Sequence, residues 1–162
     1  MRFVLLFLLL MAAPLWADQE TNTYSLIVED LKAVEGDMRV LDRLLEKKVG
    51  YTPRDLETAR SKYAELKALY DSDRKKMESF SRSAHAEARE MVKKMLDSQD
   101  KWASSTVFVI DMEVRANDYY KGKSVSYDPD RGAAMSSSAR AEAVAARQLY
   151  GELKATVLKK LN

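Results

Sequence analysis

Apolar residues that recur in alternating steps of four and three constrain this chain more than any other feature of its sequence. The first such series consists of Ile27, Leu31, Val34, Met38, Leu41 and Leu45, and Tyr24 extends it toward the N-terminus. This spacing places the apolar residues along one side of an α-helix and is typical of helices that pack lengthwise on one another. It predicts a helix over residues 24–48, which Gly50 can end with a left-handed cap.

A second helix is predicted to begin at Pro53. Thr52 is a good N-cap, proline suits the first helical position, and acidic residues follow in the first turn. Asp73 interrupts the heptad of this helix, which otherwise runs through Leu56, Ala59, Tyr63, Leu66, Tyr70, Met77, Phe80, Ala84, Ala88, Met91 and Met95. We expect one helix over 53–97, and a break near 71–73 is the alternative.

The segment 107–114 fits two periods. With period two, its alternate residues share one face, as in a half-buried strand. With the helical period, Ala103, Val107, Ile110 and Val114 line a helix over 99–121 that Gly122 ends. A strand here could form a two-stranded hairpin at best, and such a hairpin is only marginally stable by itself. The helix is therefore the favoured interpretation.

The last helix is predicted over 134–161, after a loop over 122–133. Its seam begins with small residues and ends with larger ones: Ala139, Ala143, Ala146, Tyr150, Leu153 and Val157. This order predicts an interface with one tight end and one bulky end. Asp128 and Asp130 in the loop indicate a turn and a helix cap, because the calcium loop of an EF-hand needs glycine where Arg131 stands.

Charge indicates which helices are neighbours. The first helix is flanked mostly by acids and the last mostly by bases, and opposite charges beside apolar seams favour pairing of two helices. Few glycines and prolines agree with a helical chain. We expect an all-α fold with three to five helices: an elongated antiparallel helical bundle, coiled-coil-like, formed by a single domain over 18–162.

The N-terminus has the layout of a secretory signal peptide. One positive charge at Arg2 precedes an apolar run over 3–11, and Pro14 and Ala17 follow. The run is shorter than the roughly 20 apolar residues that span a membrane. We therefore expect a signal peptide over 1–17, cleavage near Ala17, no stable membrane anchor afterwards, and a periplasmic or secreted protein.

The composition argues against a metal site and against nucleic-acid binding. The chain has no cysteine and one histidine, His85, so a nitrogen or sulfur metal site would need several chains. No catalytic, cofactor-binding or metal-binding residue is predicted. Nucleic acid is not an expected partner, because the chain is exported and its formal net charge is only +2.

Aromatic residues gather over residues 102–127, along the predicted third helix and in the loop that follows. They are Trp102, Phe108, Tyr119, Tyr120 and Tyr127. Aromatic rings provide contact area with little entropy to lose on binding. These five residues are our candidates for a partner or ligand surface, and the alternative is that they cover the end of the bundle.

Two classes of function remain, with an all-helical enzyme as a less favoured third. The first is a non-enzymatic interaction or scaffold protein of the bacterial cell envelope, which binds a protein partner or another copy of itself through its heptad seams. The second is a periplasmic holdase-type chaperone. In size, export and long helices the chain resembles the Skp class of such chaperones, although the N-terminal strand of that class has no counterpart here.

Overall fold

The computed structural model describes residues 19–47, 49–79 and 86–161, and over these residues the protein is helical without any strand. The signal peptide predicted over 1–17 and His85 lie outside the described residues. None of the described helices is both long and apolar enough to traverse a membrane. The helices are a segment over residues 19–33, α2 (Glu35–Glu46), α3 (Pro53–Glu78), α4 (Ala86–Tyr120) and α5 (Pro129–Leu161).

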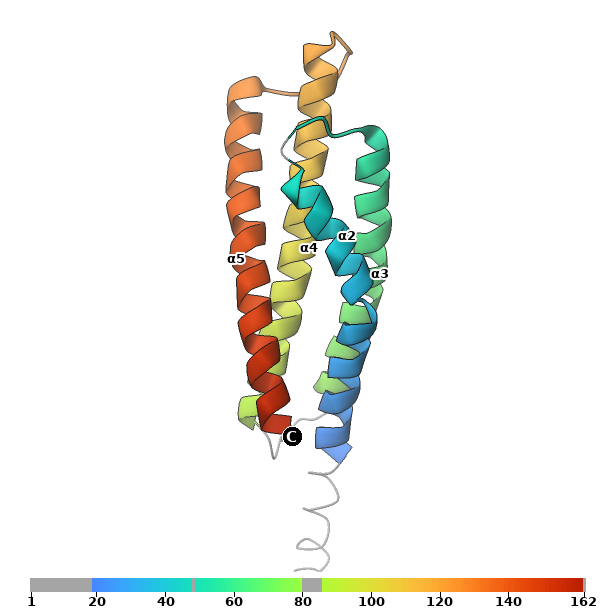
Figure 1. Cartoon of the computed structure of the whole chain (residues 1–162), viewed down its shortest axis with the longest axis vertical. Coiled ribbons are helices and arrows are strands. Elements are labelled where there is room, and N and C mark those ends of the chain that lie inside the picture. The colour runs from blue at the N-terminus through green and yellow to red at the C-terminus, as the bar shows by residue number, and fades with distance from the viewer. Residues whose placement is uncertain (1–18, 48, 80–85, 162) are drawn as a thin grey trace, which may run out of the picture.

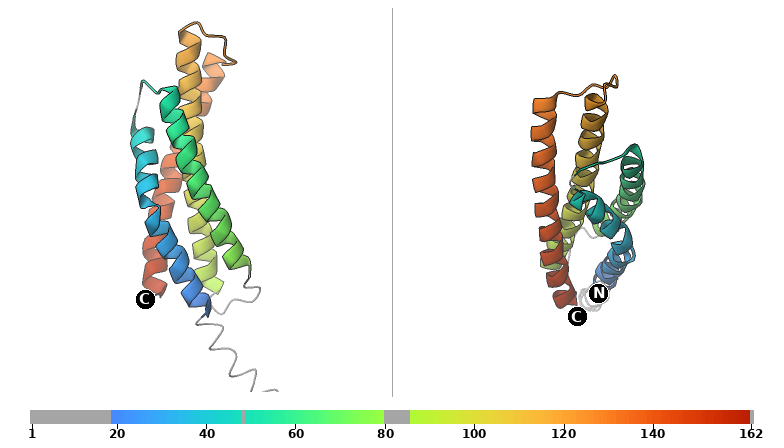
Figure 2. Two further views of the ribbon diagram at one scale, coloured as in Figure 1. Left: turned by 90° about the vertical axis from the view of Figure 1, so that its right-hand side faces the viewer. Right: turned by 45° about the horizontal axis from the view of Figure 1, so that its top comes forward.

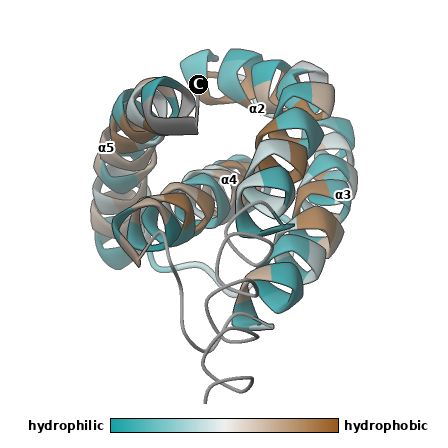
Figure 3. Ribbon diagram, turned by 90° about the horizontal axis from the view of Figure 1, so that it is seen from below, coloured by the Kyte–Doolittle hydropathy of each residue, from teal (hydrophilic) through white to brown (hydrophobic). Residues whose placement is uncertain are grey.

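The helices lie side by side along the molecule, and α3, α4 and α5 alternate in direction (Figure 1). The segment over 19–33 and α2 follow one another along one side (Figure 2). Helix α4 is central, because α2, α3 and α5 all pack against it, and α2 also packs against α3. Seen from below, α3 and α5 lie on opposite sides of α4, and α2 lies across from it (Figure 3).

The apolar seams predicted from the sequence form the core of the molecule. Buried seam residues come from every described helix: Tyr24, Ile27, Leu31, Met38, Leu41, Leu45, Leu56, Ala59, Leu66, Met77, Ala88, Met95, Ile110, Val114, Ala143, Ala146, Tyr150 and Val157. Val34, Tyr63, Tyr70 and Leu153 are partly buried against them. Over the described residues, the predicted seams are confirmed and are buried between helices of the same chain, whereas Phe80 and Ala84 of the second seam lie outside the described residues.

Local signals at the helix ends also match the structure. The Thr52 hydroxyl accepts a hydrogen bond from the backbone N–H of Asp55 at 3.2 Å, and the Asp55 carboxylate accepts one from the Thr52 N–H at 2.7 Å, which makes a capping box. Gly50 and Gly122 have φ angles of 76° and 74°, the left-handed conformation expected after a helix. Residues 107–114 are helical within α4, so the strand alternative is wrong.

The single helix predicted over 24–48 is interrupted at Val34, where a turn separates the segment over 19–33 from α2. The Asp37 N–H donates to the Val34 carbonyl, three residues earlier, at 3.0 Å. This separation is one residue shorter than in an α-helix and is typical of a 3₁₀ turn. Gly36 follows in the first turn of α2, and glycine has a weak helix propensity.

Neither interpretation of residues 53–97 is correct. Helix α3 passes through 71–73 without a break and ends at Glu78. Asp73, which was expected to interrupt the seam, is fully buried within it. The ammonium of Lys76 lies 2.8 Å from its carboxylate, which compensates part of the cost of burying an acid.

The boundary predicted between 97 and 99 is also wrong, because α4 passes straight through it. Ser98 and Gln99 are buried there. The Ser98 hydroxyl donates to the Met95 carbonyl at 2.8 Å, and the Gln99 amide contacts the Met38 sulfur at 3.6 Å. These polar side chains therefore lie inside the core and do not mark a helix end, although the Gln99 side-chain oxygen has no hydrogen-bond partner among the described residues.

Helix α5 begins at Pro129, earlier than the predicted residue 134, so the loop is shorter than predicted. The Asp128 carboxylate accepts hydrogen bonds at 3.1 Å from the backbone N–H groups of Asp130 and Arg131. Asp128 is therefore the N-cap and Pro129 the first helical residue. The turn and cap predicted for this string are confirmed, and only the start of the helix was misplaced.

Candidate functional site

Helix α5 meets its two neighbours in different ways. Its small and apolar seam residues, among them Ala143 and Ala146, are buried in the core, and α5 packs closely against α4. Toward α2 it presents three cations at intervals of seven residues: Arg140, Arg147 and Lys154. Seven residues are close to two helical turns, so these three side chains follow one face of α5.

Two of these cations form ion pairs with acids of α2. Arg147 lies 3.1 Å from Asp42 through Nη2 and Oδ2, and 3.8 Å from the carboxylate of Glu46. Lys154 pairs with Glu35. The predicted opposite charges do pair the first and last helices, but the apolar seams of these two helices do not pack closely on each other as predicted. The contact is made by long side chains, whereas close packing of α5 occurs on α4.

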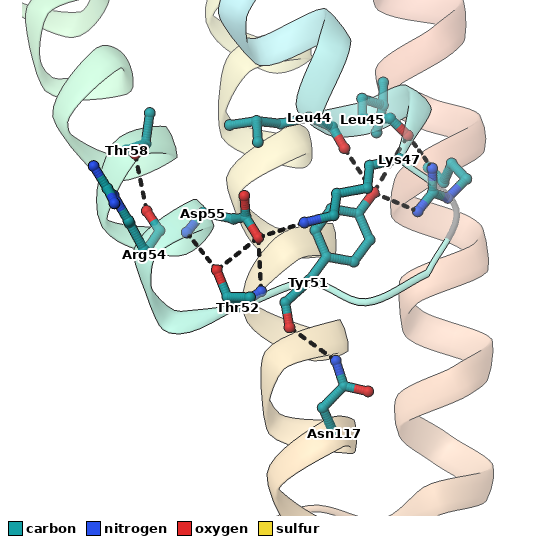
Figure 4. A network of polar contacts seen from close by, with 10 residues as sticks. Leu44, Leu45, Lys47, Tyr51, Thr52, Arg54, Asp55, Thr58 and Asn117 are labelled. Carbon is teal, nitrogen blue, oxygen red and sulfur yellow. Dashed lines mark hydrogen bonds and ion pairs between the residues drawn. The ribbon is translucent and has the colours of Figure 1, made fainter.

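The third cation joins α5 to the connection between α2 and α3. Arg140 donates to the Leu45 carbonyl, and at 3.1 Å to the hydroxyl of Tyr51, which is itself buried. That hydroxyl donates to the Leu44 carbonyl at 2.7 Å, and the Tyr51 carbonyl accepts from the side chain of Asn117 on α4 at 2.9 Å (Figure 4). The end of α2 is thereby tied to both α4 and α5. We call the contacts of Arg140, Arg147 and Lys154 the α2–α5 ladder.

Between the ladder contacts of Arg147 and Lys154, α2 and α5 border a cleft of about 250 Å³, which we call the α2–α5 cleft. Its lining comes from three helices: Glu35, Met38, Arg39 and Asp42 of α2, Trp102 of α4, and Arg147, Tyr150 and Gly151 of α5. A second hollow of about 530 Å³ is lined by Leu45, Glu46, Glu113, Arg140, Val144 and Arg147. Arg147 borders both hollows.

Three residues that line the α2–α5 cleft carry a buried polar atom that has no hydrogen-bond partner in the part of the chain that the structure describes. These atoms are Asp42 Oδ1, Trp102 Nε1 and the Tyr150 hydroxyl. Trp102 and Tyr150 are only 4% and 7% exposed. Because native proteins satisfy almost all buried polar groups, an unsatisfied group of this kind calls for a water molecule, an ion or a ligand.

Burial changes the proton affinities at this site. It raises the pKa of Asp42 to about 6, against the lowering effect of Arg147. It also raises the pKa of Tyr150, which therefore remains a hydrogen-bond donor at neutral pH. The hydrogen bond from Lys154 lowers the pKa of Glu35. Asp42 is thus the group of the cleft whose charge changes in mild acid.

The five aromatic residues predicted as a surface lie in three different places. Trp102 lines the α2–α5 cleft, with its ring 6.1 Å from that of Tyr150 and 5.9 Å from the Arg147 guanidinium. Phe108 lines a separate groove of about 460 Å³ between α4 and α5, where Met135 is exposed at the surface. Neither residue belongs to the tyrosine cluster described next.

Tyr119, Tyr120 and Tyr127 gather where α4 ends and the loop begins. The Tyr119 ring lies 5.4 Å from that of Tyr120 and 5.8 Å from that of Tyr127. A Cβ atom at Gly132 would collide with the Tyr127 ring, so glycine is needed in the first turn of α5 for this close approach. Tyr119 and Tyr120 of this cluster remain 42% and 72% exposed.

Sequence reasoning missed most of the residues that line the cleft, among them Arg39, Asp42, Arg147 and Tyr150. A signal was present in the seven-residue spacing of the three cations of α5, opposite Glu35 and the other acids of the first helix. The charge bias of the two helices was recognised from the sequence, but this register was not.

Among the described residues, no group of three or more histidine, cysteine, aspartate or glutamate side chains is placed to hold a metal ion. Comparison with protein families, with curated proteins and with solved structures gives no match for this chain. The geometry of the α2–α5 cleft is therefore the basis for a functional proposal.

Proposed function

We propose that this chain is an exported, non-enzymatic interaction protein of the bacterial cell envelope, and that it holds a partner in the α2–α5 cleft. The observation that carries the proposal is the contrast within the cleft: long side chains bridge α2 and α5, and three of the lining residues have a buried polar atom without a partner among the described residues. An interface used only for stability would gain by packing closely and by satisfying these groups.

The architecture we propose is an elongated antiparallel bundle with coiled-coil-like packing inside the chain. Seam residues such as Ile27, Leu41 and Ala143 are already buried between its own helices. Self-association or partner binding through the seams would require these helices to separate. The α2–α5 cleft is open without such a change, so it is the better surface for a partner.

The location of the protein follows from its N-terminal sequence. We propose that residues 1–17 are removed on export and that the mature protein begins at Asp18, in the periplasm or outside the cell, with no stable membrane anchor. Intact-mass measurement of the protein recovered from the envelope fraction tests this proposal. A mass that includes the first seventeen residues would contradict it.

Site-specific photo-crosslinking in living cells tests the proposed binding function. The probe residue replaces Gly151, which lines the cleft and has open space at the position where a side chain would begin. The matched control places the same probe at Ala64, an exposed position on α3. We expect one discrete crosslinked product from position 151, identified by mass spectrometry, and none from position 64.

The other outcomes are equally informative. A broad series of many products from position 151 would favour the holdase-type chaperone over a protein with one defined partner. Equal products from both positions, or none from position 151, would contradict binding in the cleft.

A further inference from the structure

Three residues that line the α2–α5 cleft carry hydrogen-bond donors without a hydrogen-bond or ion-pair partner among the described residues. Arg39 is exposed on α2 and lines the cleft, where its charge acts on Glu35 without forming a close ion pair with an acid of the described residues. The other two donors are the indole N–H of Trp102 and the hydroxyl of Tyr150. A cationic donor together with neutral donors is an arrangement that recognises a carboxylate.

The same cleft offers an acceptor. One carboxylate oxygen of Asp42 is held by Arg147 at 3.1 Å, and the other lacks a partner. This second oxygen can accept a hydrogen bond from an amine or amide N–H. The Arg147 pair holds Asp42 in place and leaves that oxygen available.

Size and charge restrict the ligand further. The cleft of about 250 Å³ is several times larger than the roughly 30 Å³ that one water molecule takes up in the liquid. Glu35 and Asp42 line it together with Arg39 and Arg147, so its acidic and basic side chains are balanced, which suits a ligand that presents a carboxylate beside an N–H group. Met38 and Trp102 provide an apolar wall for a short side chain.

We propose that the α2–α5 cleft binds an α-carboxylate together with its neighbouring amine or amide N–H, as presented by a free amino acid or by the last residue of a peptide chain. The carboxylate lies at Arg39 and the unused donors, and the N–H group lies at Asp42. This proposal rests on the proposed binding function, because it names the part of the partner that the same cleft holds.

Fluorescence of Trp102 provides the direct readout. The chain has two tryptophans, so Trp16→Phe leaves Trp102 as the sole tryptophan of the full chain. The probes are free leucine and free phenylalanine, and tripeptides ending in either residue with a free or an amidated C-terminus. We expect saturable changes in emission with probes that have a free carboxylate, and affinity at least about ten-fold weaker with the amidated peptides.

Matched variants separate recognition from folding. Arg39→Gln should weaken binding about ten-fold or more, while Arg43→Gln, an exposed position one turn further along α2 and outside the cleft lining, should leave it unchanged. Tyr150→Phe removes only a hydroxyl that has no hydrogen-bond partner among the described residues, and it should weaken binding without loss of stability. Calorimetric titration checks both results without a fluorescent reporter.

Each outcome has one meaning. Binding of free amino acids supports the proposal and identifies them as the source of the carboxylate, and binding of free-ended peptides alone supports it with a chain terminus as the source. Equal binding of amidated peptides, absence of any binding, or equal effects of Arg39→Gln and Arg43→Gln would overturn it. In those cases a discrete crosslink from position 151 would still support the proposed function, whereas loss of that crosslink alone would count against the function.

Discussion

Helix α5 forms two interfaces that differ in almost every physical respect. Against α4 it packs closely, with small residues such as Ala143 completely buried. Against α2 it reaches across a cleft with Arg140, Arg147 and Lys154. The first interface excludes water from apolar surface, and the second depends on charges that water and salt can screen.

The difference between the two interfaces indicates that the α4–α5 contact contributes most to stability and that the α2–α5 contact is the better candidate for function. Dispersion and the hydrophobic effect make the α4–α5 contact intolerant of changes in volume. Ion pairs at the surface contribute little net stability, so the α2–α5 ladder can rearrange at a small cost in free energy. Helices α4 and α5, which pack closely, thus carry one wall of the cleft, and α2 supplies the other wall, which packs on α3 and α4 and is joined to α5 by long side chains.

The largest effect is expected from overpacking the α4–α5 interface. Ala143→Leu forces extra methylene groups into a site that is fully buried and should lower the free energy of unfolding by about 2 kcal/mol. Ala145→Leu, an exposed position on the same helix, should change it by less than about 0.5 kcal/mol. Urea unfolding followed by circular dichroism measures both. A similar loss in the two variants would show that α5 does not pack on α4 through this face.

A smaller effect is expected at the central contact of the ladder. The pKa of Asp42 is raised to about 6 from 3.8, so the folded state binds this proton more tightly than the unfolded state does. Stability should therefore fall as pH rises from about 4 through about 6. Asp42→Asn removes this contribution, and we expect it to flatten that part of the profile and to raise stability at pH 7 by about 1 kcal/mol, once the lost pair with Arg147 is included.

Unfolding measured at several pH values in both proteins checks this prediction. The comparison with the unsubstituted chain cancels the contributions of other acids, including Asp73, whose pKa is also raised by burial. A profile of Asp42→Asn that keeps the original slope between pH 4 and pH 6 would contradict the assignment.

Tyr150 lies where the two interfaces meet, and its hydroxyl tests whether the cleft is optimised for stability. Tyr150→Phe keeps the ring that lies 6.1 Å from Trp102 and deletes a buried group without a partner. We expect the free energy of unfolding to stay the same or to rise by up to about 1 kcal/mol. The thermal midpoint measures the change. A clear loss of stability would show that the hydroxyl has a partner within the folded protein, such as an ordered water.

The fold was predicted correctly where the sequence pattern that indicates it lies within a single helix. The seams repeat along single helices, and the capping box of Thr52 and Asp55 spans one turn, so both can be recognised without knowledge of other helices. Asp73 shows the limit of such reasoning. Its ion-pair partner Lys76 also contacts Asp30, at 2.8 Å, and Asp30 belongs to a different helix. Asp73 therefore looks like an interruption of the seam when its own helix is considered alone, because part of what compensates its burial comes from another helix.

The candidate site was predicted less well for the same reason. Of the five aromatic residues, only Trp102 lines the α2–α5 cleft. The cleft exists because α2 and α5 stand apart while both pack on α4. That separation depends on the packing of three helices, and no periodicity within one helix encodes it. The overall charge bias predicted that the first and last helices are neighbours, but could not indicate that ion pairs would bridge a cleft between them.

The smallest effect is expected at the contact of Lys154 with Glu35, at the other end of the cleft. Glu35 is 42% exposed, and exposed ion pairs contribute only a few tenths of a kcal/mol. Lys154→Gln should therefore lower the free energy of unfolding by about 0.3 kcal/mol at low salt, and the loss should vanish in about 1 M sodium chloride because salt screens the pair. Lys159→Gln, an exposed position near the end of α5, is the control and should have no effect at either salt concentration. A loss larger than that of Ala143→Leu, or one that persists at high salt, would mean that this end of α2 is held by packing. The contrast between the two interfaces of α5 would then not extend along the whole helix.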